Sequence, residues 1–208
     1  MQNVFTKKSS IVFFLTILLS TFSYAQRGGT SSKFSVGAMA LFGTGKMGNG
    51  LIGAGNAADR DMLYTSLGLF AGFNIKKFRL GLNYEYMMAG QSTDPGASGD
   101  GKLDGTNISG TATTPGVRLE YYDGKNSFGL VYRLSTDYKL DKTTLASTAA
   151  TYKGSGGISV QYMRQLKNKL GIVIDYTTET FNDSLTTGNV KWNRIGLGVV
   201  FTNFSGGR

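Results

Sequence analysis

The 208-residue sequence contains no cysteine and no histidine, and each absence removes a class of chemistry. Without cysteine, the chain can form no disulfide, no thiolate metal site and no thiol nucleophile. Without histidine, a Ser-His-Asp-type triad lacks its imidazole base, so histidine-dependent lipases and proteases are excluded in their usual forms. We therefore expect a protein that is not an enzyme and carries no cofactor.

Proline and clustered positive charge are also scarce. Two prolines stand against 30 glycines, which favours turns and close backbone approach over a disordered linker. The formal net charge is +9, but no run of basic residues and no basic helix face concentrates it. Because nucleic-acid binding needs such a basic patch, we expect no nucleic-acid partner.

The first 25 residues have the three parts of a secretory signal peptide. Two lysines form a basic region, residues 11–19 are apolar with one exception, and residues 23–25 form a small-x-small cleavage site. The apolar run is too short for a transmembrane helix, which needs about 20 apolar residues. We predict a cleaved signal peptide at residues 1–25, followed by one domain at residues 26–208.

Eight segments of that domain alternate apolar and polar residues. From Phe78 to Met88 every second residue is Phe, Leu, Tyr or Met, whereas Arg79 and Glu85 lie among the positions between. A period of two places successive side chains on opposite faces of a β-strand, and no segment shows a helical period of comparable strength. The predicted strands lie near residues 33–43, 63–75, 78–88, 117–122, 127–138, 151–165, 169–180 and 191–203.

The links between these strands alternate between long and short. The short links are tight turns, one of which contains a hairpin-favouring Asp-Gly, and the long links are rich in Gly, Ser, Thr, Asn and Asp. This alternation predicts an up-and-down sheet with all long links at one end. The short links lie at residues 76–77, 123–126 and 166–168, and the long ones at about 44–62, 90–110, 139–150 and 182–190.

The composition of the two strand faces indicates which face is outside. The polar face carries Gly, Ser, Asn and isolated charges, whereas a solvated exterior normally carries dense Lys and Glu. Aromatic residues lie towards the strand ends of the apolar face, as with Phe34 and Phe42 or Phe128 and Tyr138, like the girdles of a membrane barrel. We predict an all-β, eight-stranded antiparallel up-and-down transmembrane β-barrel. The alternative is a soluble lipocalin-like barrel with an apolar interior.

The inward face would then carry charged side chains of both signs. We expect a buried ion-pair network, because an unpaired charge inside a barrel is costly. Eight strands leave an interior that side chains nearly fill, which favours a plug over a gated polar pathway or a proton relay. The predicted lumenal charges are Arg79, Glu120 and Arg118 lowest, Glu85, Arg133 and Asp175 in the middle, and Asp137, Glu179 and Arg194 highest.

One long link resembles a calcium-binding loop only weakly. Asp100 and Asp104 stand at suitable positions, but Lys102 occupies a ligand position and Thr111 replaces the glutamate expected at the twelfth. We therefore predict no metal site and treat Asp100 and Asp104 as turn residues first.

Taken together, the predicted signal peptide, eight strands, tight turns and polar lumen resemble the small OmpA/OmpX-type outer-membrane barrels. Arg194, Gly196, Val199 and Phe201 also resemble the assembly signal of that family, although the chain continues to Arg208. The resemblance implies the outer membrane of a Gram-negative bacterium, with both termini in the periplasm. It implies as partners outer-membrane lipid and lipopolysaccharide, the barrel-assembly machinery, and an extracellular ligand or host surface.

Two functions fit such a barrel. The first is a non-enzymatic structural or surface-interaction role, as a monomer, with specificity in the four long links. The second is a transporter of small or apolar molecules that resembles the OmpW type, with a narrow lumenal or lateral route.

Overall fold

A computed structural model describes residues 34–47, 60–91, 109–142, 151–182 and 189–202 of the chain. The predicted signal peptide at residues 1–25, Asp100 and Asp104 lie outside these residues. Among the described residues, no helix has both the length and the apolar character needed to cross a membrane.

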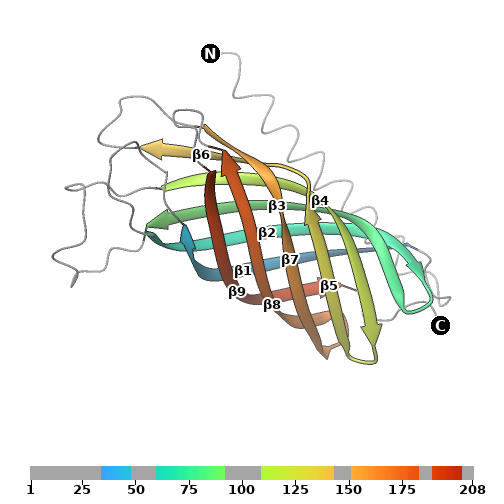
Figure 1. Cartoon of the computed structure of the whole chain (residues 1–208). Helices are drawn as coiled ribbons and strands as arrows, with labels where there is room; N and C mark the ends of the chain where they lie inside the picture. The colour runs from blue at the N-terminus through green and yellow to red at the C-terminus, as the bar shows by residue number, and fades with distance from the viewer. Residues whose placement is uncertain (1–33, 48–59, 92–108, 143–150, 183–188, 203–208) are drawn as a thin grey trace, which may run out of the picture.

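The described chain consists of antiparallel strands (Figure 1). Seven of them contain 13 to 17 residues, long enough to cross a bilayer at a tilt. Their bounds are β1 Phe34–Met47, β2 Arg60–Ile75, β3 Phe78–Gln91, β4 Ser109–Asp123, β5 Asn126–Arg133, β6 Thr136–Lys142, β7 Thr151–Lys167, β8 Leu170–Asn182 and β9 Asn189–Thr202.

The sheet closes on itself. β1 pairs with β9 as well as with β2, and β2–β3, β3–β4, β7–β8 and β8–β9 also pair. β5 and β6 lie end to end, because both pair with β4 on one side and β7 on the other. The two segments form one interrupted barrel strand, and the eight-stranded up-and-down barrel predicted from the alternation is confirmed.

The interruption at Leu134 and Ser135 corrects one prediction. From Arg133 to Asp137 this strand advances four residues while the paired stretch of β4 advances three, so it carries one extra residue. An extra residue reverses the faces of every side chain beyond it. Asp137 is therefore exposed on the outer face, and Tyr138, predicted to face lipid, is buried at 1% exposure.

A second irregularity lies beside the first, on β7. The register with β8 shifts between Gly154 and Gly156, so this Gly-rich segment forms a bulge. Gly156 has a φ of 114°, which a residue with a side chain rarely adopts. Together the two bulges distort the barrel wall near the end of the long links.

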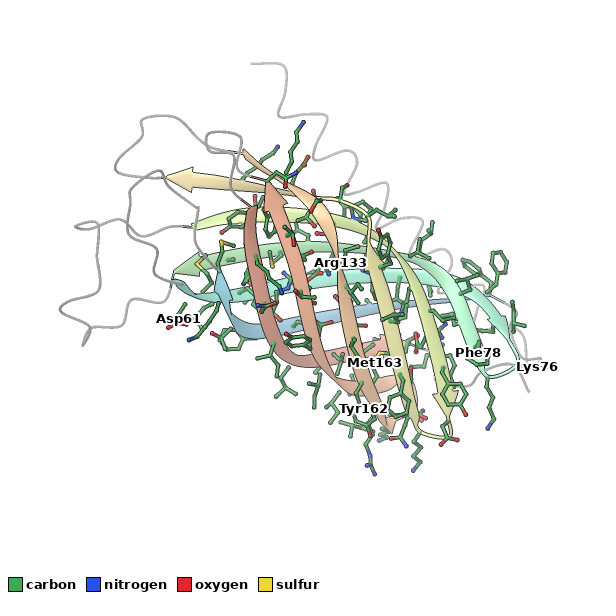
Figure 2. All side chains as sticks on the ribbon, in the orientation of Figure 1. Asp61, Lys76, Phe78, Arg133, Tyr162 and Met163 are labelled. Carbon is green, nitrogen blue, oxygen red and sulfur yellow. The ribbon has the colours of Figure 1, made fainter. Side chains whose placement is uncertain are left out.

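The outer face of the barrel is apolar, whereas the inner face carries buried charged and polar side chains among apolar ones. Leu67, Leu82 and Leu197 are 61–67% exposed, whereas Arg133 and Glu120 are at most 2% exposed. Figure 2 shows Arg133 within the barrel while Phe78 and Tyr162 point away from it. A soluble lipocalin-like barrel needs the reverse arrangement, so that alternative is wrong, and the fold is that of a transmembrane barrel.

The tight turns all lie at one end of the barrel. They contain Lys76, Gly124 and Asn168, each with a φ of 50–61°. The third turn spans residues 168–169, slightly beyond its predicted position. β1 begins and β9 ends at this same end, since Phe34 pairs with Phe73 and Phe201 with Leu170. The strand ends joined by the long links lie at the other end (Figure 1).

Candidate functional site

Eight of the nine predicted lumenal charges are buried inside the barrel, and Asp137 is the exception. Each of the eight has an exposed fraction of 3% or less. Four are positive and four negative, so the buried charges sum to zero. They are Arg79, Arg118, Arg133 and Arg194, and Glu85, Glu120, Asp175 and Glu179.

A first cluster surrounds Glu120 near the tight-turn end. Its Oε2 atom lies 3.0 Å from Arg118 Nε and 3.3 Å from Arg79 Nη1, and its Oε1 accepts a 2.5 Å hydrogen bond from Ser127. Arg79 also donates to Thr202 Oγ1 on β9 at 3.1 Å. The two arginines and one carboxylate match the lowest layer expected from the sequence.

A second cluster crosses the barrel nearer the long-link end. Glu85 on β3 lies 2.6 Å from Arg133 on β5 and 3.2 Å from Arg194 on β9. Glu179 on β8 pairs with Arg133 and lies 3.7 Å from Arg194, and it accepts a 3.1 Å hydrogen bond from Thr136. Two carboxylates thus alternate with two guanidinium groups, and four of the six charges predicted for the middle and highest layers form one ring.

Asp175 belongs to neither cluster but connects them through neutral groups. Gln161 donates to Asp175 Oδ1 at 2.8 Å and accepts from Arg118 at 2.6 Å. Thr177 donates to Asp175 Oδ2 at 2.7 Å and lies 2.6 Å from Ser159 Oγ, which accepts from an arginine of the second cluster. These contacts therefore join all eight buried charges into one network along the lumen.

Aromatic and methionine side chains close the lumen beyond the second cluster. This layer was not predicted from the sequence. Trp192 is fully buried, and its ring centroid lies 5.8 Å from that of Tyr138 and 6.2 Å from those of Phe181 and Tyr64. The alternation of side chains along the strand could have placed Tyr64 inside the barrel, because its neighbours in the chain lie on the outer face. Met47, Met62 and Met87 are buried in the same core.

The arginines also pack on aromatic faces. The Arg118 guanidinium carbon lies 4.2 Å from the Phe70 ring centroid, and that of Arg79 lies 4.9 Å from the Tyr122 centroid. Arg194 lies 5.0 Å from the Tyr64 centroid. Such cation–π contacts satisfy the flat faces of guanidinium groups whose edges are hydrogen-bonded.

Glycines in the barrel wall make room for these large lumenal groups. A Cβ atom built on Gly196 would lie 2.2 Å from the Tyr64 hydroxyl, and one on Gly37 would lie 2.2 Å from the Phe70 ring. Real Cβ atoms do not approach other atoms so closely, so each ring occupies the space that a side chain would need. The lumen is therefore close-packed at both positions.

The residues of the predicted assembly signal alternate between the two faces of β9. Arg194 and Gly196 are buried at inward-facing positions, whereas Val199 and Phe201 are 52% and 41% exposed on the outer face. Their role in assembly stays a prediction. No group of acidic side chains among the described strands has the arrangement of a metal site.

Comparisons with known proteins support the fold. No family model and no curated protein matches the chain. Neisserial surface protein A aligns with a TM-score of 0.52 at 13% identity, covering 82% of this chain and 97% of that one. Ail, the attachment invasion locus protein of Yersinia pestis, aligns with a TM-score of 0.50 at 9% identity, covering 80% and 97%.

A second structure of Ail, in complex with the heparin analogue sucrose octasulfate, aligns with a TM-score of 0.49 at 12% identity, covering 80% of this chain and 98% of that one. Both neighbours are small eight-stranded outer-membrane barrels. Identities this low speak to architecture alone. The chain therefore shares the fold of these eight-stranded transmembrane β-barrels.

Proposed function

We propose that this protein is a non-enzymatic outer-membrane barrel with a plugged lumen. Its role would be structural or one of surface interaction, exerted through the four long links. The observation that carries this proposal is the packed, charge-balanced network across the lumen, closed at one end by the Trp192 layer. A barrel filled in this way offers its outer ends, and not its interior, to other molecules.

The ring of the second cluster supports the plug. Glu85, Arg133, Glu179 and Arg194 come from β3, β5, β8 and β9, so their ion pairs join different walls of the barrel. Opening a path through the ring requires separating buried opposite charges. Breaking one buried pair costs about 3–5 kcal/mol, which opposes spontaneous opening.

The orientation is part of the same proposal. In outer-membrane barrels the tight turns face the periplasm and the longer loops face outward. We infer that both termini are periplasmic, that residues 1–25 direct export, and that β9 presents the assembly signal to the barrel-assembly machinery. The long links then reach the lipopolysaccharide layer and an extracellular ligand or host surface. A closed sheet needs no second copy to pair its edges, which favours a monomer.

Single-channel recording in planar bilayers tests the plug against narrow-channel transport. We expect no steady conductance from the wild-type barrel, because the lumen is occupied along the two charge clusters. The variant Arg133→Gln/Asp175→Asn removes one charge of each sign and serves as the comparison. A steady wild-type conductance whose size or ion selectivity changes in this variant would contradict the plug and favour the transporter.

A further inference from the structure

The tight-turn end of the barrel concentrates positive charge. Six basic side chains surround the tight-turn end, five of them exposed and one half-buried, and we call this set the basic collar. The acidic residue beside them, Asp123, lies 3.9 Å from Lys77. By contrast, the long links at residues 44–62, 90–110, 139–150 and 182–190 mix seven aspartates with five basic residues. The basic collar consists of Lys76, Lys77, Lys125, Arg164, Lys167 and Lys169.

A girdle of aromatic pairs lies next to the basic collar on the outer face. Phe34 and Phe73 have ring centroids 5.3 Å apart, and Phe78 and Tyr121 pack at 5.2 Å. A third pair, Phe128 and Tyr162, packs at 5.3 Å. Aromatic girdles mark the level at which hydrocarbon meets the headgroups of a bilayer.

The girdle and the collar are close in the chain as well as in space. Arg164 follows Tyr162 by two residues on the same face of β7, and the Lys77 ammonium lies 6.0 Å from the Tyr121 ring centroid. In Figure 2, Phe78 lies beside Lys76 at the end opposite Asp61. The collar therefore stands at headgroup height, where lysine and arginine stems cover apolar surface while their charges reach the polar layer.

We propose that the basic collar binds the phosphates of anionic phospholipid headgroups in the leaflet at the tight-turn end. Basic residues next to a membrane attract anionic lipids, and here six cations meet one carboxylate among the described turns. A soluble acidic partner would not need the adjoining aromatic girdle. The choice of leaflet rests on the proposed orientation, whereas headgroup binding rests on the collar and girdle alone.

The test compares binding of phosphatidylglycerol and phosphatidylcholine to the folded barrel in detergent, counted as lipid adducts by native mass spectrometry. The collar variant is K76Q/K125Q/K167Q/K169Q, which leaves the ion pair of Lys77 intact. The matched control, K46Q/K139Q/K153Q/K191Q, removes four exposed lysines from the other end. Heat-modifiable migration on gels verifies that each protein has folded, and separates failure of the barrel from failure of the collar.

We expect the wild-type protein to prefer phosphatidylglycerol by about fivefold or more, since several cations act together. The collar variant should lose this preference and the control should keep it. For the wild-type protein, raising NaCl from low to high concentration should also weaken the preference, because salt screens exposed charges. This salt measurement tests the proposal even if the collar variant does not fold.

Three results would overturn the proposal. The first is equal binding of the two lipids by the wild-type protein. The second is an equal loss of preference in the control, which would mean that the preference depends on the overall positive charge and not on the collar. The third is displacement of phosphatidylglycerol by sn-glycerol 3-phosphate at similar concentration, which would assign the collar to soluble phosphates.

Discussion

Glu120 illustrates at the scale of one residue how this barrel tolerates buried charge. Its carboxylate is fully buried, yet both oxygens are engaged, by two guanidinium groups and the hydroxyl of Ser127. Desolvation of an ion costs several kcal/mol, and such pairing offsets it only when every partner is present. Asp137, with the same charge, is exposed and needs no such environment.

The contrast between these two acids gives a prediction. Glu120→Gln would leave Arg79 and Arg118 without their shared carboxylate and should lower the free energy of unfolding by about 3–5 kcal/mol. Asp137→Asn is the matched control and should change it by less than about 0.5 kcal/mol, as exposed substitutions do. Chemical denaturation in detergent micelles measures both. Equal destabilisation by the two changes would mean that Asp137 also contributes to the lumenal network.

At the scale of elements, the interrupted strand formed by β5 and β6 decides which side chains fill the lumen. One extra residue relative to β4 turns Tyr138 inward, where it packs on Trp192 and Phe181. The backbone N–H of Leu134 bonds to the carbonyl of Pro115 at 3.0 Å, which holds the bulge against β4. The bulge thus builds the aromatic layer that closes the lumen.

Cysteine labelling tests the reversal of faces, because the chain has no native cysteine. In the folded barrel, Asp137→Cys should react readily with a water-soluble maleimide, whereas Tyr138→Cys should be protected. Val131→Cys, placed before the interruption at a buried position, serves as the protected control. The opposite order of reactivity at positions 137 and 138 would show that the alternation continues unbroken through this strand.

At the scale of the whole molecule, the barrel encloses a charged network and an aromatic and methionine layer within an apolar shell. Large apolar side chains such as Leu82, at 67% exposure, cover its outer face, while the buried charges balance within. Closure of the sheet pairs the backbone groups that lipid cannot satisfy. The apolar outer face and the closed sheet both meet the requirements of a barrel that is surrounded by hydrocarbon.

The apolar shell predicts an unusual cost for a surface substitution. Leu82→Lys should lower the free energy of unfolding of the barrel in lipid vesicles by about 2–4 kcal/mol, because it places a charge in the hydrocarbon layer. Thr65→Lys, exposed nearer the long-link end, should cost about 0–1 kcal/mol and is the control. A Leu82→Lys barrel that folds as stably as the wild type would contradict the assignment of this face to lipid.

The sequence by itself determined the strand number, the up-and-down topology and the identity of the two faces. These follow from residue periodicity and link length, which are local properties. The same reasoning predicted eight of the nine lumenal charges, because the alternation of side chains along a strand places them on the inner face.

Only the tertiary structure decided which charges are in contact and where the alternation of inward and outward side chains is reversed. Glu85 and Arg194 lie 109 residues apart in the chain, and their contact depends on the stagger of a closed sheet. Whether the strand formed by β5 and β6 contains one residue more than the facing stretch of β4 depends on how the two strands pair. The sequence of that strand alone therefore could not assign Asp137 or Tyr138 to a face of the sheet. Likewise Trp192 becomes the centre of an aromatic layer only when closure brings β2, β6, β8 and β9 around one lumen.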